Sequence, residues 1–320
     1  MGDRRQFLKQ LAGAGALIAT SRLPLFATDR PEIFPGRGRF ERLSLSYAVV
    51  NIGLAEPFSL LHISDSHLTA AYGHEGEKKQ TLTAQRTQTF GGMQEQALQD
   101  ALAWAKQHVE FIVHTGDLID WHSEANFDLV RKFFPDGLVG CIGNHEFSPD
   151  MKLSDPPVEK TEEFKKPLRK AVQDAFPFDI SFQSQVVHGV NFITLDDVFG
   201  YVTKKQVRKF KKEVRKGLPI VLCMHVPFYS EDMWRANYRF WKCKAPMTDA
   251  VVPAPTGDYK TQLEDPVTRD FIAYLKQEPL LKCILTGHAH FSFDDAFSPT
   301  CRQYVTAGGF LFHGREVIFI

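Results

Sequence analysis

The chain contains the stretch FSLLHISDSH (residues 58–67), in which an apolar run ends in two residues that can bind metal. Residues 58–63 have the length and the branched-residue content of a buried strand. Asp65 and His67 follow where such a strand would end. The same arrangement recurs at four other places in the chain.

These four places are also short apolar runs followed by polar residues. The runs at residues 111–113, 138–142, 220–224 and 283–285 precede Gly116-Asp117, Gly143-Asn144-His145-Glu146, His225 and Gly287-His288-Ala289-His290. If all five runs are neighbouring strands of one sheet, their polar groups meet at its carboxyl edge, where open α/β sheets bind ligands. We therefore expect five scattered segments to converge on one site.

The segments between these runs predict the fold class. Apolar residues recur at helical spacing in residues 94–108, 127–134, 161–176, 204–216 and 265–277. Further strands are expected at residues 178–183, 186–195, 292–297, 302–307 and 316–320. Strands that alternate with helices, followed by strand pairs, predict an α/β fold of two packed mixed β-sheets flanked by helices.

Composition indicates an ordinary globular chain. Its 320 residues are 43% hydrophobic and 24% charged, which favours one domain. The formal net charge of zero provides no global field that would attract nucleic acid or an anionic membrane. The basic run at residues 204–216 is interpreted as the solvated face of an amphipathic helix, so no nucleic-acid partner is expected.

The first residues resemble a twin-arginine export signal. Arg4-Arg5-Gln6-Phe7-Leu8 precedes a weakly apolar stretch at residues 11–20, although Asp3 stands where Ser or Thr is usual. We expect residues 1–27 to be a signal peptide and residues 28–320 to form one domain. A charged amphipathic helix at the N-terminus is the alternative.

The expected location follows from this signal. The apolar stretch is shorter than the roughly 20 residues that span a membrane, and no cysteine precedes Cys141 to carry a lipid at the signal junction. We expect a periplasmic or secreted protein without a stable membrane anchor, exported by the twin-arginine machinery.

The five cysteines do not have the spacing of a zinc cluster. Cys141, Cys223 and Cys283 lie inside apolar runs, where a thiol acts as a small hydrophobic group. Cys243 and Cys301 remain candidates for a disulfide, which spacing alone does not decide.

The polar residues after the apolar runs suit metal ions of intermediate hardness. Carboxylates, imidazoles and an amide oxygen favour manganese, iron or zinc. The number of candidate ligands is sufficient for two divalent or trivalent ions, which together can activate water and hold a phosphoryl group.

The ordered series from about Leu60 to His290 resembles the calcineurin-like metallophosphoesterase superfamily, whose fold is an α/β/β/α sandwich. The resemblance implies two metal ions with one shared ligand, Asp117. The expected ligands of the first ion are Asp65, His67 and His290, and those of the second are Asn144, His225 and His288.

The resemblance also implies a reaction. A hydroxide that bridges the two ions would attack phosphorus in line, and His145 would bind phosphate or protonate the leaving oxygen. Glu146 would orient His145, and Asn144 would lie beside the substrate. These residues imply a small-molecule phosphate ester as substrate.

Residues next to the candidate ligands indicate which subfamilies the chain does not resemble. Trp121 and Leu68 replace an arginine and a glycine of the protein serine/threonine phosphatases, and Asp120 replaces an iron-binding tyrosine of the purple acid phosphatases. Residues 62–68 look most like the cyclic-nucleotide and glycerophosphodiester phosphodiesterases. We therefore expect a slight preference for phosphodiesters, with two alternatives: a phosphomonoesterase or nucleotidase, and a metal-binding scaffold without turnover.

Residues 229–264 contain several prolines and show weak periodicity, so we predict an inserted loop that acts as a lid over the site. Arg235 and Arg239 within it are candidates for binding the substrate phosphate, because guanidinium groups bind phosphate oxygens. Aromatic residues that could also line the pocket are Tyr72, Trp121, Tyr229 and Trp241.

Overall fold

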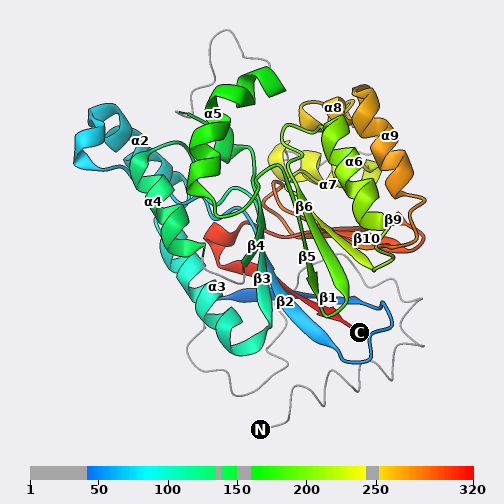
Figure 1. The fold of residues 1–320 in the computed structure, drawn as a ribbon. Helices are drawn as coiled ribbons and strands as arrows, with labels where there is room; N and C mark the ends of the chain where they lie inside the picture. The colour runs from blue at the N-terminus through cyan, green and yellow to red at the C-terminus, as the bar shows by residue number, and fades with distance from the viewer. Residues whose placement is uncertain (1–41, 135–137, 150–159, 243–251) are drawn as a thin grey trace.

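The structure is a computed structural model, and it describes residues 42–134, 138–149, 160–242 and 252–320 (Figure 1). The expected signal peptide, residues 1–27, lies outside these ranges, and so does Cys243 of the candidate disulfide. Among the described residues, no helix has both the length and the apolar character needed to span a bilayer.

The first β-sheet has five strands and carries the beginning and the end of the described chain. β11 pairs in parallel with β1 and antiparallel with β2, while β2, β3 and β4 are parallel to one another. The strand order is β1 (Ser44–Val50), β11 (His313–Phe319), β2 (Phe58–Ile63), β3 (Phe111–Thr115) and β4 (Leu138–Cys141).

The second β-sheet has six strands, and its central four are parallel. The edge strands β5 and β9 run antiparallel to their neighbours. The strand order is β5 (Phe182–Val187), β6 (Val190–Leu195), β7 (Ile220–Cys223), β8 (Leu281–Thr286), β10 (Cys301–Val305) and β9 (Phe293–Ser298).

An apolar core holds the two sheets face to face. The rings of Phe58 and Phe192 lie 6.4 Å apart, and those of Phe192 and Phe319 lie 5.8 Å apart, both edge to face. The thiols of Cys223 and Cys283 are fully buried in the same cluster. The sequence prediction that these cysteines pack in the core is therefore confirmed.

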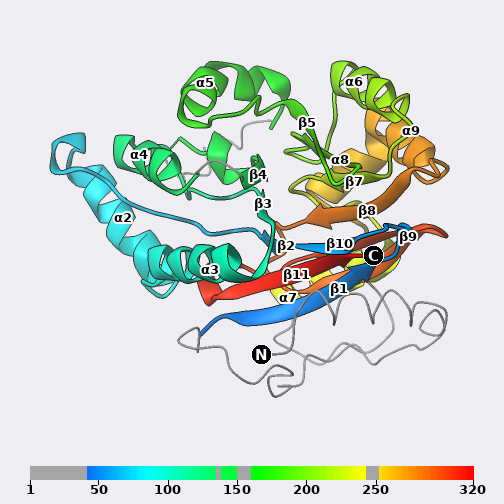
Figure 2. The same ribbon diagram turned by 60° about the horizontal axis from the view of Figure 1, so that its bottom comes forward.

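Helices cover the outer face of each sheet (Figures 1 and 2). α3 (Gln94–His108), α4 (Glu124–Phe133) and α5 (Glu162–Ala175) bury apolar residues with the first sheet, and α6 (Lys204–Val214) and α9 (Pro266–Leu275) do so with the second. The remaining helical segments are α2 (Glu77–Thr89), α7 (Glu231–Lys242), α8 (Asp258–Glu264), η1 (Gly73–Glu75), η2 (His145–Phe147) and η3 (Gly309–Leu311).

The expected α/β fold of two mixed sheets flanked by helices is confirmed, with two corrections. The five apolar runs do not share one sheet, because β2, β3 and β4 belong to the first sheet whereas β7 and β8 belong to the second. Residues 229–264 are not a plain loop: they include α7 and α8, which are anchored by the buried Met233, Trp234 and Tyr259.

The packing of α6 generates a stability prediction. Phe210 is fully buried, and its ring lies 5.3 Å from the ring of Phe271 on α9. Phe210→Ala should lower the free energy of unfolding by about 3–5 kcal/mol, because it leaves a cavity beneath the helix. Chemical denaturation measures this change. Lys205→Ala on the exposed face of α6 is the control and should change stability by less than about 0.5 kcal/mol. Equal effects of the two variants would contradict this packing.

Candidate metal centre

The seven candidate ligands lie just beyond the carboxyl ends of strands from both sheets. Asp65 and His67 follow β2, and the other ligands follow four further strands: Asp117 after β3, Asn144 after β4, His225 after β7, and His288 and His290 after β8. The side chains nevertheless meet, because these strand ends of the two packed sheets lie at the same edge of the molecule.

Four of these side chains form a first cluster. Nε2 of His290 lies 3.2 Å from Oδ1 of Asp65 and 3.0 Å from Nε2 of His67. Nε2 of His67 lies 3.9 Å from Oδ2 of Asp117. One ligand atom from each of the four residues lies within 4.8 Å of the others. This is the set that the sequence assigned to the first ion, together with the shared aspartate.

The second cluster also contains Asp117. Oδ2 of Asp117 lies 3.2 Å from Nε2 of His225, which lies 3.2 Å from Nδ1 of His288. Oδ1 of Asn144 approaches the same two nitrogen atoms at 3.2 and 2.9 Å. Asp117 therefore joins the two clusters, in the position expected of a bridging ligand.

The backbone of this centre is strained. Five of the candidate ligands have a left-handed backbone conformation, which residues with a side chain rarely adopt. Such strain costs about 1–3 kcal/mol at each residue and concentrates at functional sites. The φ angles are 54° at Asp65, 47° at His67, 54° at Asp117, 65° at His288 and 62° at His290.

Close approach explains the glycines that precede the ligands. A Cβ atom at Gly143 would lie 2.2 Å from Oδ1 of Asp117. A Cβ atom at Gly287 would lie 1.8 Å from Oγ of Ser64 and 2.5 Å from Oδ2 of Asp65. Only glycine lets these segments come so close to the carboxylates of the other strands.

Hydrogen bonds fix which imidazole nitrogens can bind a cation. Nδ1 of His225 donates to the carbonyl of Thr115 at 2.7 Å, and Nδ1 of His67 donates to Oδ1 of Asp120 at 2.9 Å. In each neutral ring, Nε2 is then left with its lone pair facing the Asp117 carboxylate. Converging lone pairs repel unless a cation lies between them, so this donor set fits two metal ions.

The charges of the buried groups agree with a cation site. Burial raises the pKa of Asp117, but the neighbouring His225 and His145 lower it by a larger amount. The pKa of Asp117 therefore lies well below its usual value. Burial lowers the pKa of His225, whereas Asp117 raises it to about 10. Without a metal ion, the carboxylates therefore favour a proton on His225, and a metal ion would take the place of that proton.

His145 lies beside the first cluster and is oriented by Asp120. Nδ1 of His145 donates to the backbone carbonyl of Asp120 at 2.8 Å and lies 2.9 Å from its Oδ1 atom. Nη2 of Arg86, on α2, binds the same Oδ1 atom at 2.8 Å. Asp120 is thus a positioning residue for His145. In the sequence it was noted only as a difference from the purple acid phosphatases.

The expected role of Glu146 is wrong. Its carboxylate accepts backbone N–H groups of Asp117, Gly143 and Ile119 at 2.9, 2.6 and 3.1 Å. It therefore ties the loops after β3 and β4 together and does not orient the ring of His145. Burial, followed by the charge of Asp117, raises the pKa of Glu146 to about 7.

Two further carboxylates hold the ligands of the second cluster. Oδ2 of Asp258, at the start of α8, lies 3.1 Å from Nε2 of His288. Oδ1 of Asp197 accepts the backbone N–H of His225 at 3.0 Å. Sequence reasoning missed both residues, although Asp197 also follows an apolar strand, β6.

Among the described residues, neither candidate arginine of α7 forms a hydrogen bond or an ion pair with a candidate ligand. Nη2 of Arg235 pairs with Oε1 of Glu231 at 2.8 Å. Arg239 is exposed. It precedes Trp241 by two residues, so the two side chains leave the helix in directions about 200° apart. The ring of Trp241 is the one that lies over the site, 5.4 Å from the ring of His290.

The other aromatic candidates lie elsewhere. Trp121 is fully buried, and its Nε1 donates to Thr69 at 2.8 Å. The hydroxyl of Tyr72 donates to Asp128, and that of Tyr229 donates to Glu231, both at 2.9 Å.

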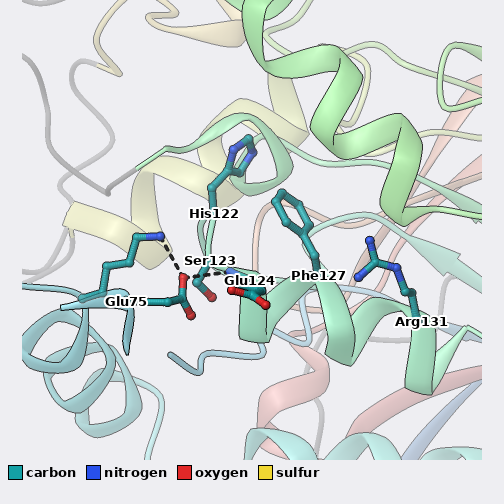
Figure 3. A pocket seen from close by; sticks show the side chains of 7 residues that line it. Glu75, His122, Ser123, Glu124, Phe127 and Arg131 are labelled. Carbon is teal, nitrogen blue, oxygen red and sulfur yellow. Dashed lines mark hydrogen bonds and ion pairs between the residues drawn. The ribbon is translucent and has the colours of Figure 1, made fainter. Parts of the chain in front are cut away.

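A surface cleft lies beside the start of α4 (Figure 3). Its volume is about 440 Å³. The carboxylate of Glu75 accepts a hydrogen bond from Nζ of Lys79 and the backbone N–H of Glu124, both at 2.8 Å. The lining residues are Glu75, Lys79, His122, Ser123, Glu124, Phe127 and Arg131. None of them is a candidate ligand, so the cleft is separate from the metal centre.

Solved structures with similar folds are distant from this chain. A dimetal phosphatase from Danio rerio is 13% identical, with 79% of this chain and 88% of that chain covered and a TM-score of 0.41. A calcineurin-like phosphoesterase from Bacillus subtilis is 10% identical, with 79% and 82% covered and a TM-score of 0.39. A 5'-nucleotidase from Candida albicans is 11% identical, with 84% and 46% covered and a TM-score of 0.38.

The family is shown by the sequence itself. A comparison with curated protein sequences gives no match. The profile of the calcineurin-like phosphoesterase family matches residues 58–292, from the start of β2 to just beyond His290. This range contains all seven candidate ligands, and the chain therefore belongs to the calcineurin-like phosphoesterase family.

Proposed function

We propose that the protein is a dinuclear metal-dependent phosphoesterase with a slight preference for phosphodiesters. The observation that carries this proposal is Asp117, whose Oδ2 atom lies 3.9 Å from Nε2 of His67 in one cluster and 3.2 Å from Nε2 of His225 in the other. A carboxylate shared between two such clusters is suited to two metal ions close together.

Each cluster would hold one ion of manganese, iron or zinc, and Asp117 would bind both. Two ions in this arrangement supply Lewis acidity and activate water for attack on phosphorus. The chain keeps the ligands in place through Asp120, Asp258 and the carbonyl of Thr115, which bind the outer nitrogens of the imidazole rings.

His145 supports a proton-transfer step. Its Nε2 atom lies 4.0 Å from Oδ2 of Asp117, and its side chain is 16% exposed, so solvent reaches the ring. Burial lowers the pKa of His145, but Asp117 and Asp120 raise it to about 9. In the metal-free protein the two carboxylates therefore favour the protonated ring, and a protonated ring can donate a proton to a leaving oxygen or bind a phosphate oxygen.

The preference for phosphodiesters rests on the opening motif. Residues 62–68 resemble the cyclic-nucleotide and glycerophosphodiester phosphodiesterases, whereas phosphomonoesterases and nucleotidases of the same family remain the second candidate. Turnover of bis(4-nitrophenyl) phosphate against 4-nitrophenyl phosphate distinguishes the two.

The first prediction from the proposed function tests the metal centre. Protein loaded with manganese, iron or zinc should contain two ions per chain and hydrolyse a nitrophenyl phosphate ester, and a chelator should abolish the activity. Asp117→Ala should lower turnover by more than about a hundredfold and reduce the metal content below two ions, because it removes the shared ligand. Elemental analysis and an absorbance assay measure both. Two bound ions with full turnover in Asp117→Ala would refute the assignment.

A second prediction concerns His145. General acid catalysis contributes about 10²–10⁴-fold, and it matters most when the leaving group is a poor one. His145→Ala should therefore reduce the hydrolysis of alkyl esters by about this factor and that of nitrophenyl esters by less than about tenfold. Steady-state kinetics with the two ester types measures the difference. Equal losses would argue against proton donation by His145.

A third prediction concerns Asp120. Asp120→Asn keeps the shape of the side chain but removes the negative charge beside His145, so the pKa of His145 should fall from about 9. NMR titration of the imidazole protons in the metal-free protein measures this pKa. Asp258→Asn is the control, because Asp258 contacts His288. An unchanged pKa in Asp120→Asn would show that Asp120 does not control the charge of His145.

A further inference from the structure

A chain of aromatic rings leads away from the first metal cluster. The ring of Trp241 lies 5.4 Å from that of His290 and 5.2 Å from that of Phe240. Phe240 in turn lies 5.0 Å from Phe291. The ring of Phe310 lies 5.3 Å from that of His290. Rings from three separate segments therefore border one side of the site.

Two of these rings are unusually exposed. Trp241 is 55% exposed and Phe240 is 52% exposed, although the first half of the same helix buries Met233 and Trp234. Large aromatic side chains in water lose the stabilisation that burial provides. Adjacent exposed aromatic rings beside a reactive centre are typical of a ligand-binding surface.

The helix presents Trp241 in a defined position. Trp234 is buried, its ring lies 5.8 Å from that of Tyr259, and its Nε1 donates to the carbonyl of Pro253 at 2.6 Å. Trp241 follows Trp234 by seven residues, which is two helical turns, so the two rings share one face of α7. The anchored first half of α7 thus places Trp241 over His290.

Two arginines near this surface are engaged in ion pairs. The guanidinium of Arg86 is bound to Asp120, and that of Arg235 is bound to Glu231. The part of an ester that extends past His290 therefore meets the aromatic rings of Trp241 and Phe240, with the exposed Arg239 and Lys242 beside them in the sequence of α7.

We propose that Trp241 and Phe240 form a stacking surface for a planar aromatic group of the substrate, so that the preferred esters are aryl or similar aromatic phosphate esters. The inference rests on the proposed function, because it places the phosphoryl group at the two clusters. Trp241 would contact one face of the aromatic group, while the metal ions held by His290 and the other ligands would bind the phosphoryl end. Stacking of this kind is insensitive to ring substituents, because every aromatic ring has a π face.

Phosphonates test this surface without turnover. In the metal-loaded full chain, calorimetry should show that 1-naphthylphosphonate binds about tenfold more tightly than methylphosphonate. In Trp241→Ala this preference should fall below about twofold at unchanged metal content, and Trp241→Phe should retain part of it. Tyr47→Ala, which removes an exposed aromatic ring on β1, is the matched control and should keep the full preference.

Three results would overturn the inference. They are equal binding of the two phosphonates by the wild type, a preference that survives in Trp241→Ala, and equally tight binding of hexylphosphonate, which would show an apolar surface without aromatic selectivity. A preference for naphthylphosphonate without hydrolysis of any ester would instead contradict the proposed function.

Discussion

The arrangement of the site depends on placing the carboxylate of Asp117 where the two sheets meet. Its Oδ1 atom accepts the backbone N–H of His145, and its Oδ2 atom faces imidazole nitrogens from both clusters. Two buried carboxylates, Asp65 and Asp117, and the lone pairs of several imidazoles converge there. Such a concentration of acceptors is unfavourable in a protein interior unless positive charge compensates it. The strained backbone at five candidate ligands is a second cost that the same cations would offset.

A second layer of carboxylates makes this arrangement possible. Asp120 binds two imidazole rings, Asp258 binds the outer nitrogen of His288, and Asp197 and Glu146 accept backbone N–H groups of the loops. Each of these groups fixes a ligand or a loop without occupying a ligand position. The outer layer thus determines the orientation of the centre, while the inner layer supplies the donor atoms.

The sequence was informative where the signal is local. An apolar run followed by a polar residue identifies a strand and its end, and apolar residues at helical spacing identify a helix, so β2 and α3 were predicted at their observed bounds. All seven candidate ligands came together. It was less informative where the outcome depends on pairing in space. The sequence of an apolar strand does not reveal which sheet the strand joins. The carboxylate of Glu146 was expected to orient its sequence neighbour His145, but it accepts backbone N–H groups of the loop after β3 and of the loop after β4. The same limit applies to α7, where two arginines were favoured for their charge and the helix instead turns Trp241 toward His290.

Selectivity for the organic part of a substrate must arise outside the two clusters. The polar side chains of the centre are already bound to one another or to the loops that carry them, and in the proposed reaction they would hold the metal ions and not the organic part. α7 differs, because it comes from the segment between β7 and β8 and is held by an apolar cluster of its own, which contains Trp234 and Tyr259. A change in the exposed end of α7 would therefore alter what lies beside the phosphoryl group without disturbing Asp117 or its partners. In the proposed function, the two clusters would therefore act on the phosphate ester bond, whereas the exposed end of α7 would select the organic group attached to it.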